Sequence, residues 1–91
     1  MNFEWDADKA QINITKHQVR FEVATGVFTD PDRITAKDER FDYGEDRYVT
    51  LGMAQDGILV VVATNRDEGR TIRIISARKA STAERRAYDD R

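Results

Sequence analysis

The chain has 91 residues, of which 40% are hydrophobic and 35% are charged, and its formal net charge at pH 7 is −2. This length suits a single domain over residues 1–91, with a modest margin of stability. The chain contains no cysteine and one histidine. This composition excludes disulfides and thiolate zinc sites, and we expect neither a metal site nor a cofactor.

The hydropathy pattern and the charge distribution bear on location and partners. No apolar run approaches the ~20 residues of a membrane span, and the first residues do not resemble a signal peptide, so we expect a cytoplasmic protein with no membrane contact. Residues 69–91 contain seven Lys or Arg against three Asp or Glu, whereas residues 1–68 contain eight against fourteen. The basic end could bind an anion, although solvated charge is the commoner explanation for either half taken alone.

The first residues predict a short strand and a helix. Phe3-Glu4-Trp5 alternates as a strand does, and Asp6 is a typical N-cap for a helix over residues 7–16. Asn13 and His17 lie four residues apart and share a face near the end of that helix. His17 could simply be satisfied there by the last helix carbonyls.

The middle of the chain predicts a second helix, a strand and a loop. Residues 20–28 carry apolar side chains at helical spacing, and the only proline follows them. Residues 33–36 fit a short strand. Residues 37–46 are dense in charge and predict an exposed loop, with Phe41 and Tyr43 as candidate anchors.

The sequence predicts three strands at the centre of the fold. Residues 47–53, 58–64 and 70–79 are rich in β-branched side chains, and residues 54–57 contain Asp-Gly, a tight-turn signal. The middle strand is apolar on both faces, so it should be central in an antiparallel meander. We therefore predict an α+β fold, with two N-terminal helices packed on a small antiparallel sheet and a short C-terminal helix.

The last predicted strand mixes aliphatic side chains with cations on both faces. Arg73 and Arg78 point to opposite faces of an ideal strand, so both can reach one ligand only if the strand twists, bulges or bends. Guanidinium groups match phosphate oxygens, but ion pairs with the many carboxylates are an equally simple explanation.

A capping box follows this strand. Ser81 caps a helix predicted over residues 81–89, and Glu84 reaches back to it, which is a simpler role for Glu84 than catalysis. Arg78 would lie in the positive field of this helix start. A cation is unfavourable in such a field, and either a phosphate or the Glu84 carboxylate would offset its charge.

Several short signatures follow one another along the chain. They are Phe3-Glu4-Trp5-Asp6, Lys9-Ala10, Asn13, Lys16-His17, Val19, Phe21-Glu22, Arg47-Tyr48, Leu51-Gly52, residues 72–80, Glu84-Arg85-Arg86 and Tyr88. Together they resemble the BrnT family of bacterial toxins over essentially the whole chain. The chain departs from the family pattern at Gln18, where relatives often carry Gly, and at Arg20, where a capping residue is expected.

The resemblance implies both an activity and partners. It implies a RelE-like ribonuclease fold and metal-independent RNA cleavage that inhibits translation and growth. It also implies neutralisation by a BrnA-like antitoxin that forms a ribbon-helix-helix dimer. The toxin would contact operator DNA only through this antitoxin.

Cleavage without a metal needs groups for proton transfer and for phosphate charge. In the simplest route the 2′-OH attacks the adjacent phosphate, which leaves a 2′,3′-cyclic phosphate. The catalytic candidates are His17 for proton transfer, and Arg73 and Arg78 for the phosphate. The candidates for guiding the RNA backbone are Lys16, Arg70, Lys79 and Arg85.

Other roles remain open for several residues and for the chain itself. Tyr48 and Tyr88 could stack on bases, although core packing is the simpler role for both. The alternative function is a non-catalytic binding module that docks nucleic acid or an acidic partner through its basic C-terminal end. Incubation with labelled RNA in EDTA would separate the two functions.

Overall fold

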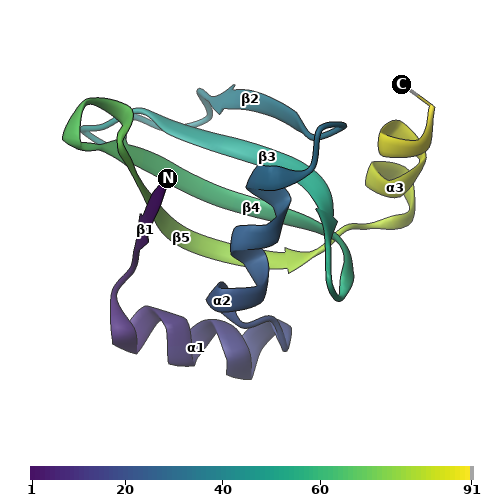
Figure 1. Ribbon diagram of the computed structural model, residues 1–91, viewed down its shortest axis with the longest axis horizontal. Helices are drawn as coiled ribbons and strands as arrows, with labels where there is room; N and C mark the ends of the chain where they lie inside the picture. The colour runs from purple at the N-terminus through teal and green to yellow at the C-terminus, as the bar shows by residue number, and fades with distance from the viewer. Residues whose placement is uncertain (91) are drawn as a thin grey trace.

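The computed structural model describes residues 1–90 (Figure 1). Its elements are β1 (Asn2–Glu4), α1 (Ala7–His17), α2 (Phe21–Ala24), the 3₁₀ helix η1 (Thr25–Thr29), β2 (Ile34–Asp38), β3 (Arg47–Ala54), β4 (Gly57–Arg66), the 3₁₀ helix η2 (Asp67–Gly69), β5 (Thr71–Lys79) and α3 (Thr82–Asp89). One five-stranded sheet has the order β1-β5-β4-β3-β2. As Figure 1 shows, α2 and η1 cross one face of this sheet, and α3 lies beyond one end of it.

The sheet is mixed, so the prediction of a purely antiparallel sheet was wrong. The predicted meander of β3, β4 and β5 is confirmed, and β4 lies between its two neighbours. However, β1 pairs in parallel with the first residues of β5, and β2 adds an antiparallel edge to β3. Alternation of side chains specifies which face of a strand is buried, but it does not specify the neighbour or the direction of a three-residue strand.

The N-terminal aromatics explain where β1 lies. Phe3 is the register partner of Ile72 on β5 and packs on Phe28 of η1, with ring centroids 5.6 Å apart. Trp5 meets the ring of Phe21 edge-on at 5.9 Å. Both rings thereby join the core between the sheet and the helices.

The first predicted helix is confirmed, and α1 extends one residue further than expected. Asp6 caps it by accepting a hydrogen bond from the backbone N–H of Lys9 at 3.0 Å. The helix ends at Gln18, whose φ of 58° lies in the left-handed region and whose N–H bonds to the Ile14 carbonyl. Glycine adopts this left-handed conformation with less strain than any other residue.

The second predicted helix is only partly correct, because one α-helical turn, α2, passes into η1. Arg20 at its N-cap makes no side-chain capping bond. The hydroxyls of Thr25 and Thr29 each donate to the carbonyl three residues earlier, which competes with regular helical hydrogen bonds. η1 also packs closely on β3, where a Cβ added to Gly52 would lie 3.0 Å from Cβ of Val27.

A β-bulge in β5 changes which side chains share a face. Val62 pairs with Ser76 and Ala63 pairs with Ile74, so Ile75 is an extra residue in β5. Beyond the bulge the alternation of side chains is reversed, and Arg73 and Arg78 therefore both lie on the face opposite α2 and η1. The strand therefore contains a bulge of the kind that both arginines would need in order to share a face.

The region after η1 confirms the predicted strand and exposed loop, with shifted boundaries. β2 covers Ile34–Asp38 and β3 begins at Arg47, so the connecting loop is residues 39–46. Gln55 and Asp56 form the tip of the turn between β3 and β4. Within residues 1–90, no helix has the length and apolar character needed to cross a bilayer.

Candidate active site

A buried asparagine fixes the end of α1 beside β5. β1 covers only the first residues of the β5 edge. Further along that edge, the amide of Asn13 donates to the Ala77 carbonyl at 2.8 Å and accepts from the Ala77 N–H at 3.1 Å. Asn13 also donates to the Val19 carbonyl at 2.9 Å. These bonds replace those of a neighbouring strand and place His17, one helical turn later, next to the end of β5.

His17 lines a cavity of about 390 Å³ on the face of the sheet opposite α2 and η1, called here the open face. The cavity is lined by His17, Arg40, Val49, Val60, Val62, Ser76, Arg78 and Glu84. The valines come from β3 and β4 and form an apolar floor. The structure therefore brings together two of the three predicted catalytic residues, His17 and Arg78.

Arg78 is held by Glu84. The Nη1 and Nη2 atoms of Arg78 donate to the two carboxylate oxygens of Glu84 at 2.7 and 2.9 Å. The predicted capping box is confirmed, since Glu84 also accepts from the Ser81 N–H at 2.8 Å. The hydrogen bonds from Arg78 lower the pKa of Glu84 to about 2. The Glu84 carboxylate thus offsets the unfavourable placement of the Arg78 cation at this helix start, so no phosphate is needed there to balance the charge.

This ion pair is accessible to solvent. The side chains of Arg78 and Glu84 are 44% and 32% exposed. The pKa of Arg78 is raised, mainly by its hydrogen bonds to Glu84, while the charge of Arg40 acts in the opposite direction. The cavity therefore contains two neighbouring guanidinium groups and one carboxylate.

Arg40 is the cavity residue that sequence reasoning missed. Its Nε and Nη2 atoms donate to the two carboxylate oxygens of Asp38 at 2.9 and 3.0 Å. The Asp38 side chain is only 2% exposed, and its pKa lies far below the usual range because of its hydrogen bonds from Arg40 and Tyr43. The sequence did contain a signal for this pair, because an acid and an arginine lie two residues apart at the end of a strand. The many other charged residues of the segment made this signal hard to recognise.

Arg73 lies on the same face but outside the cavity. Its Nη1 atom donates to the Glu4 carboxylate on β1 at 2.7 Å. Its partner on β4 is Thr64, whereas Arg78 pairs with Val60. These positions are four residue steps apart along β4, a distance of roughly 13 Å.

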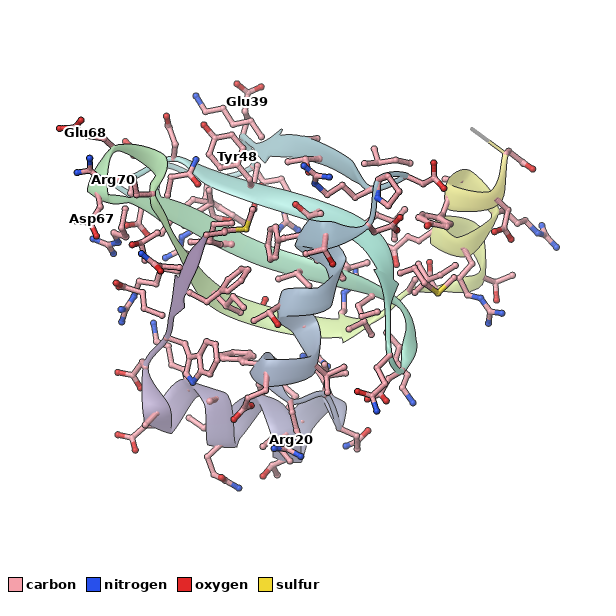
Figure 2. All side chains as sticks on the ribbon, in the orientation of Figure 1. Arg20, Glu39, Tyr48, Asp67, Glu68 and Arg70 are labelled. Atoms are coloured by element: carbon pink, nitrogen blue, oxygen red, sulfur yellow. The ribbon has the colours of Figure 1, made fainter. Side chains whose placement is uncertain are left out.

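The predicted RNA-binding residues lie in three separate places. Lys16 is exposed next to His17. Lys79 and Arg85 line a second hollow of about 340 Å³, near the turn between β3 and β4. Arg70 follows η2 at the opposite end of β5, beside Asp67 and Glu68 (Figure 2).

The two tyrosines considered for base stacking lie away from the cavity. Tyr88 is buried and donates to the Asp30 carboxylate. Tyr48 lines a hollow on the other face of the sheet, with Phe28. Among residues 1–90, no three His, Asp or Glu side chains gather closely enough to ligate a metal ion.

The comparison with protein families identifies a family for this chain. The family model described as ribonuclease toxin, BrnT, of type II toxin-antitoxin system matches residues 5–84. The matched range contains the cavity residues His17, Arg40, Arg78 and Glu84. A comparison with curated proteins finds no match. Because the family model covers most of the chain, the resemblance is confirmed: the chain belongs to the BrnT family of ribonuclease toxins of type II toxin–antitoxin systems.

Proposed function

We propose that this toxin cleaves RNA without a metal ion in the cavity on the open face of its sheet. The observation that carries the proposal is that His17 and Arg78, far apart in the sequence, line the same cavity as a second guanidinium, that of Arg40. An imidazole and two cations beside an open apolar floor provide the groups that phosphodiester transfer requires.

The reaction is an internal transfer at phosphorus. The imidazole of His17 takes the proton of a 2′-OH, and the resulting oxygen attacks the adjacent phosphorus. Negative charge grows on the non-bridging oxygens, where guanidinium groups stabilise it. The bond from phosphorus to O5′ then breaks, and O5′ takes a proton from the solvent in this open cavity. The products are a 2′,3′-cyclic phosphate and a free 5′-OH.

Arg78 is the proposed contact to the scissile phosphate. Glu84 occupies its Nη1–Nη2 edge. A guanidinium has five N–H donors, so the Nε edge keeps donors with which to bind phosphate. Glu84 therefore orients Arg78 in our account, and a phosphate does not need to displace it.

The other predicted cations act on flanking phosphates. Arg73 lies on the open face and Lys16 lies in the last turn of α1 beside His17, so in our account both bind the RNA backbone near the cavity in a salt-dependent way. Lys79 and Arg85 would meet the backbone further along. Arg70 at the opposite end of β5 would bind only a longer RNA.

The wider biology is part of the proposal. We propose a RelE-like ribonuclease fold, on the support of helices that cover one sheet face while a cationic cavity opens on the other. Cleavage in the cytoplasm would inhibit translation and arrest growth. A BrnA-like antitoxin with a ribbon-helix-helix dimer would neutralise the toxin and bind operator DNA, and copurification of the coexpressed pair tests that partnership.

The activity is tested with purified toxin and end-labelled single-stranded RNA in excess EDTA. We expect cleavage to continue at the rate seen without chelator and to leave 2′,3′-cyclic phosphate ends. Arg20→Ala is a suitable control for the loss of one positive charge, because Arg20 lies outside the cavity. Products that carry 5′-phosphate ends and disappear on chelation would reject the proposal. A toxin that binds RNA but never cuts it would support the binding module instead.

A further inference from the structure

We infer that the loop of residues 39–46 is a base-binding subsite, in which Phe41 stacks on a nucleobase beside the scissile phosphate and Arg40 binds the adjoining phosphate. The inference rests on the proposed function and adds a substrate contact to it. Nothing in the sequence pattern indicated this role, because the loop is dominated by charge.

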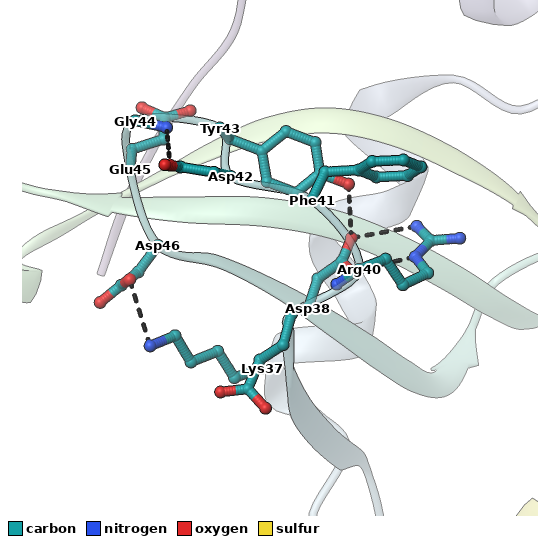
Figure 3. Close-up of a pocket in the computed structure, with 10 residues that line it drawn as sticks. Lys37, Asp38, Arg40, Phe41, Asp42, Tyr43, Gly44, Glu45 and Asp46 are labelled. Atoms are coloured by element: carbon teal, nitrogen blue, oxygen red, sulfur yellow. Dashed lines mark hydrogen bonds and ion pairs between the residues drawn. The ribbon is translucent and has the colours of Figure 1, made fainter.

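A buried carboxylate organises the loop. Besides the Arg40 guanidinium, Asp38 accepts hydrogen bonds from the Arg40 N–H at 3.2 Å and from the Tyr43 hydroxyl at 3.1 Å (Figure 3). The guanidinium uses two of its five N–H donors on Asp38. Arg40 is thus held in place by Asp38 and still has donors for a ligand.

The two aromatic side chains of the loop have different surroundings. The guanidinium of Arg47 lies 4.1 Å from the centre of the Tyr43 ring, and Arg47 also pairs with Glu45 at 3.3 Å. The Phe41 ring meets the Tyr43 ring edge-on at 5.8 Å, yet Phe41 is 67% exposed. The loop therefore holds Tyr43 in place and presents the Phe41 ring to solvent.

An exposed ring beside a guanidinium suits a single-stranded RNA. The Arg40 guanidinium lies 5.9 Å from the centre of the Phe41 ring. Flat aromatic rings and guanidinium planes are the groups on which proteins stack unpaired bases. Because Arg40 also lines the cavity of His17 and Arg78, a base stacked on Phe41 would adjoin the reacting phosphate.

Two of the four acidic side chains of the loop, and Asp38 just before it, are paired with cations. Asp38 pairs with Arg40, and Asp46 pairs with Lys37 at 3.3 Å. Glu45 lies between two arginines, Arg47 and Arg66, each at 3.3 Å. The paired cations offset part of the field that these three carboxylates would exert on a phosphate.

The test measures RNA binding separately from cleavage. An oligonucleotide that the wild-type toxin cuts at a mapped position is resynthesised with a 2′-deoxy group at the attacking nucleotide, so that it binds but cannot be cut. Fluorescence anisotropy gives its dissociation constant. We expect Phe41→Ala to weaken binding roughly 5- to 100-fold and Phe41→Tyr to bind like the wild type. Ile12→Ala is the matched control, because Ile12 is 62% exposed on α1, and it should have no effect.

Abasic substitutions identify the stacked base. Each base near the cut is removed in turn, and the penalty of Phe41→Ala should vanish for one abasic position only, since the stacking partner is then already lost. If Phe41→Ala binds RNA like the wild type, or if its penalty is equal at all abasic positions, the inference is wrong. A variant that binds antitoxin weakly but RNA normally would mark the loop as a protein contact and also overturn it. Cleavage by the wild type, which the mapping step requires, tests the proposed function independently.

Discussion

Asn13→Ala should be one of the most damaging single substitutions on α1. Asn13 makes three hydrogen bonds, two to Ala77 and one to Val19, and it is buried. Each bond contributes about 1 kcal/mol net, and a buried backbone group left without a partner costs about 1–3 kcal/mol. Water that enters the small space left by the amide would offset part of this. We expect the free energy of unfolding to fall by about 3–5 kcal/mol.

That loss is large for a chain of this size, whose total stability should be roughly 5–13 kcal/mol. Urea unfolding followed by circular dichroism measures it, with Gln11→Ala as the control because Gln11 is exposed on the same helix. The control should change the stability by less than about 0.5 kcal/mol. RNA cleavage by Asn13→Ala should fall more than the folded fraction does, since His17 loses its fixed position. A stability loss below about 1 kcal/mol would refute the view that Asn13 replaces a strand at the β5 edge.

Three further predictions follow from backbone conformation, charge and packing. Gln18→Gly should raise the free energy of unfolding by about 0.5–1 kcal/mol, because glycine adopts the φ of 58° without strain; an unchanged urea midpoint would contradict this. The pKa of Glu84, about 2 against its usual 4.5, means that its ion pair stabilises the fold above pH 4.5 and that this contribution is lost as the pH falls toward 2. Glu84→Gln should therefore cost about 1 kcal/mol at neutral pH, after allowance for solvent screening, and the melts of both proteins should converge in acid. Gly52→Ala should lower the melting temperature, because its Cβ would lie 3.2 Å from the Val27 carbonyl oxygen and 3.0 Å from Cβ of Val27.

Local signals in the sequence predicted much of the fold. Asp6 marks the start of α1, and Ser81 with Glu84 marks the start of α3, because a cap is decided by a few neighbouring residues. The three long strands were predictable from their β-branched runs. The parallel pairing of β1 was not, since it depends on aromatic packing between Phe3 and Phe28, which lie on separate elements.

The candidate site was less predictable than the fold. His17 and Arg78 were recognised from their chemistry, but their meeting depends on Asn13, which joins α1 to the edge of β5. The extra residue Ile75 in the bulge could not be located from alternation alone. Arg40 was missed because it reaches the cavity through the position of its loop in space, which the sequence alone does not specify.

The central claim is that His17 and Arg78 perform RNA cleavage and do not chiefly support the fold. The most direct measurement compares cleavage rates and urea unfolding for His17→Ala and Arg78→Ala. We expect cleavage to fall about 100-fold or more in each variant. The stability should fall by no more than about 1 kcal/mol, because the Arg78–Glu84 pair is solvent-accessible. Variants that cut RNA as fast as the wild type, or that unfold several kcal/mol more easily, would contradict the account.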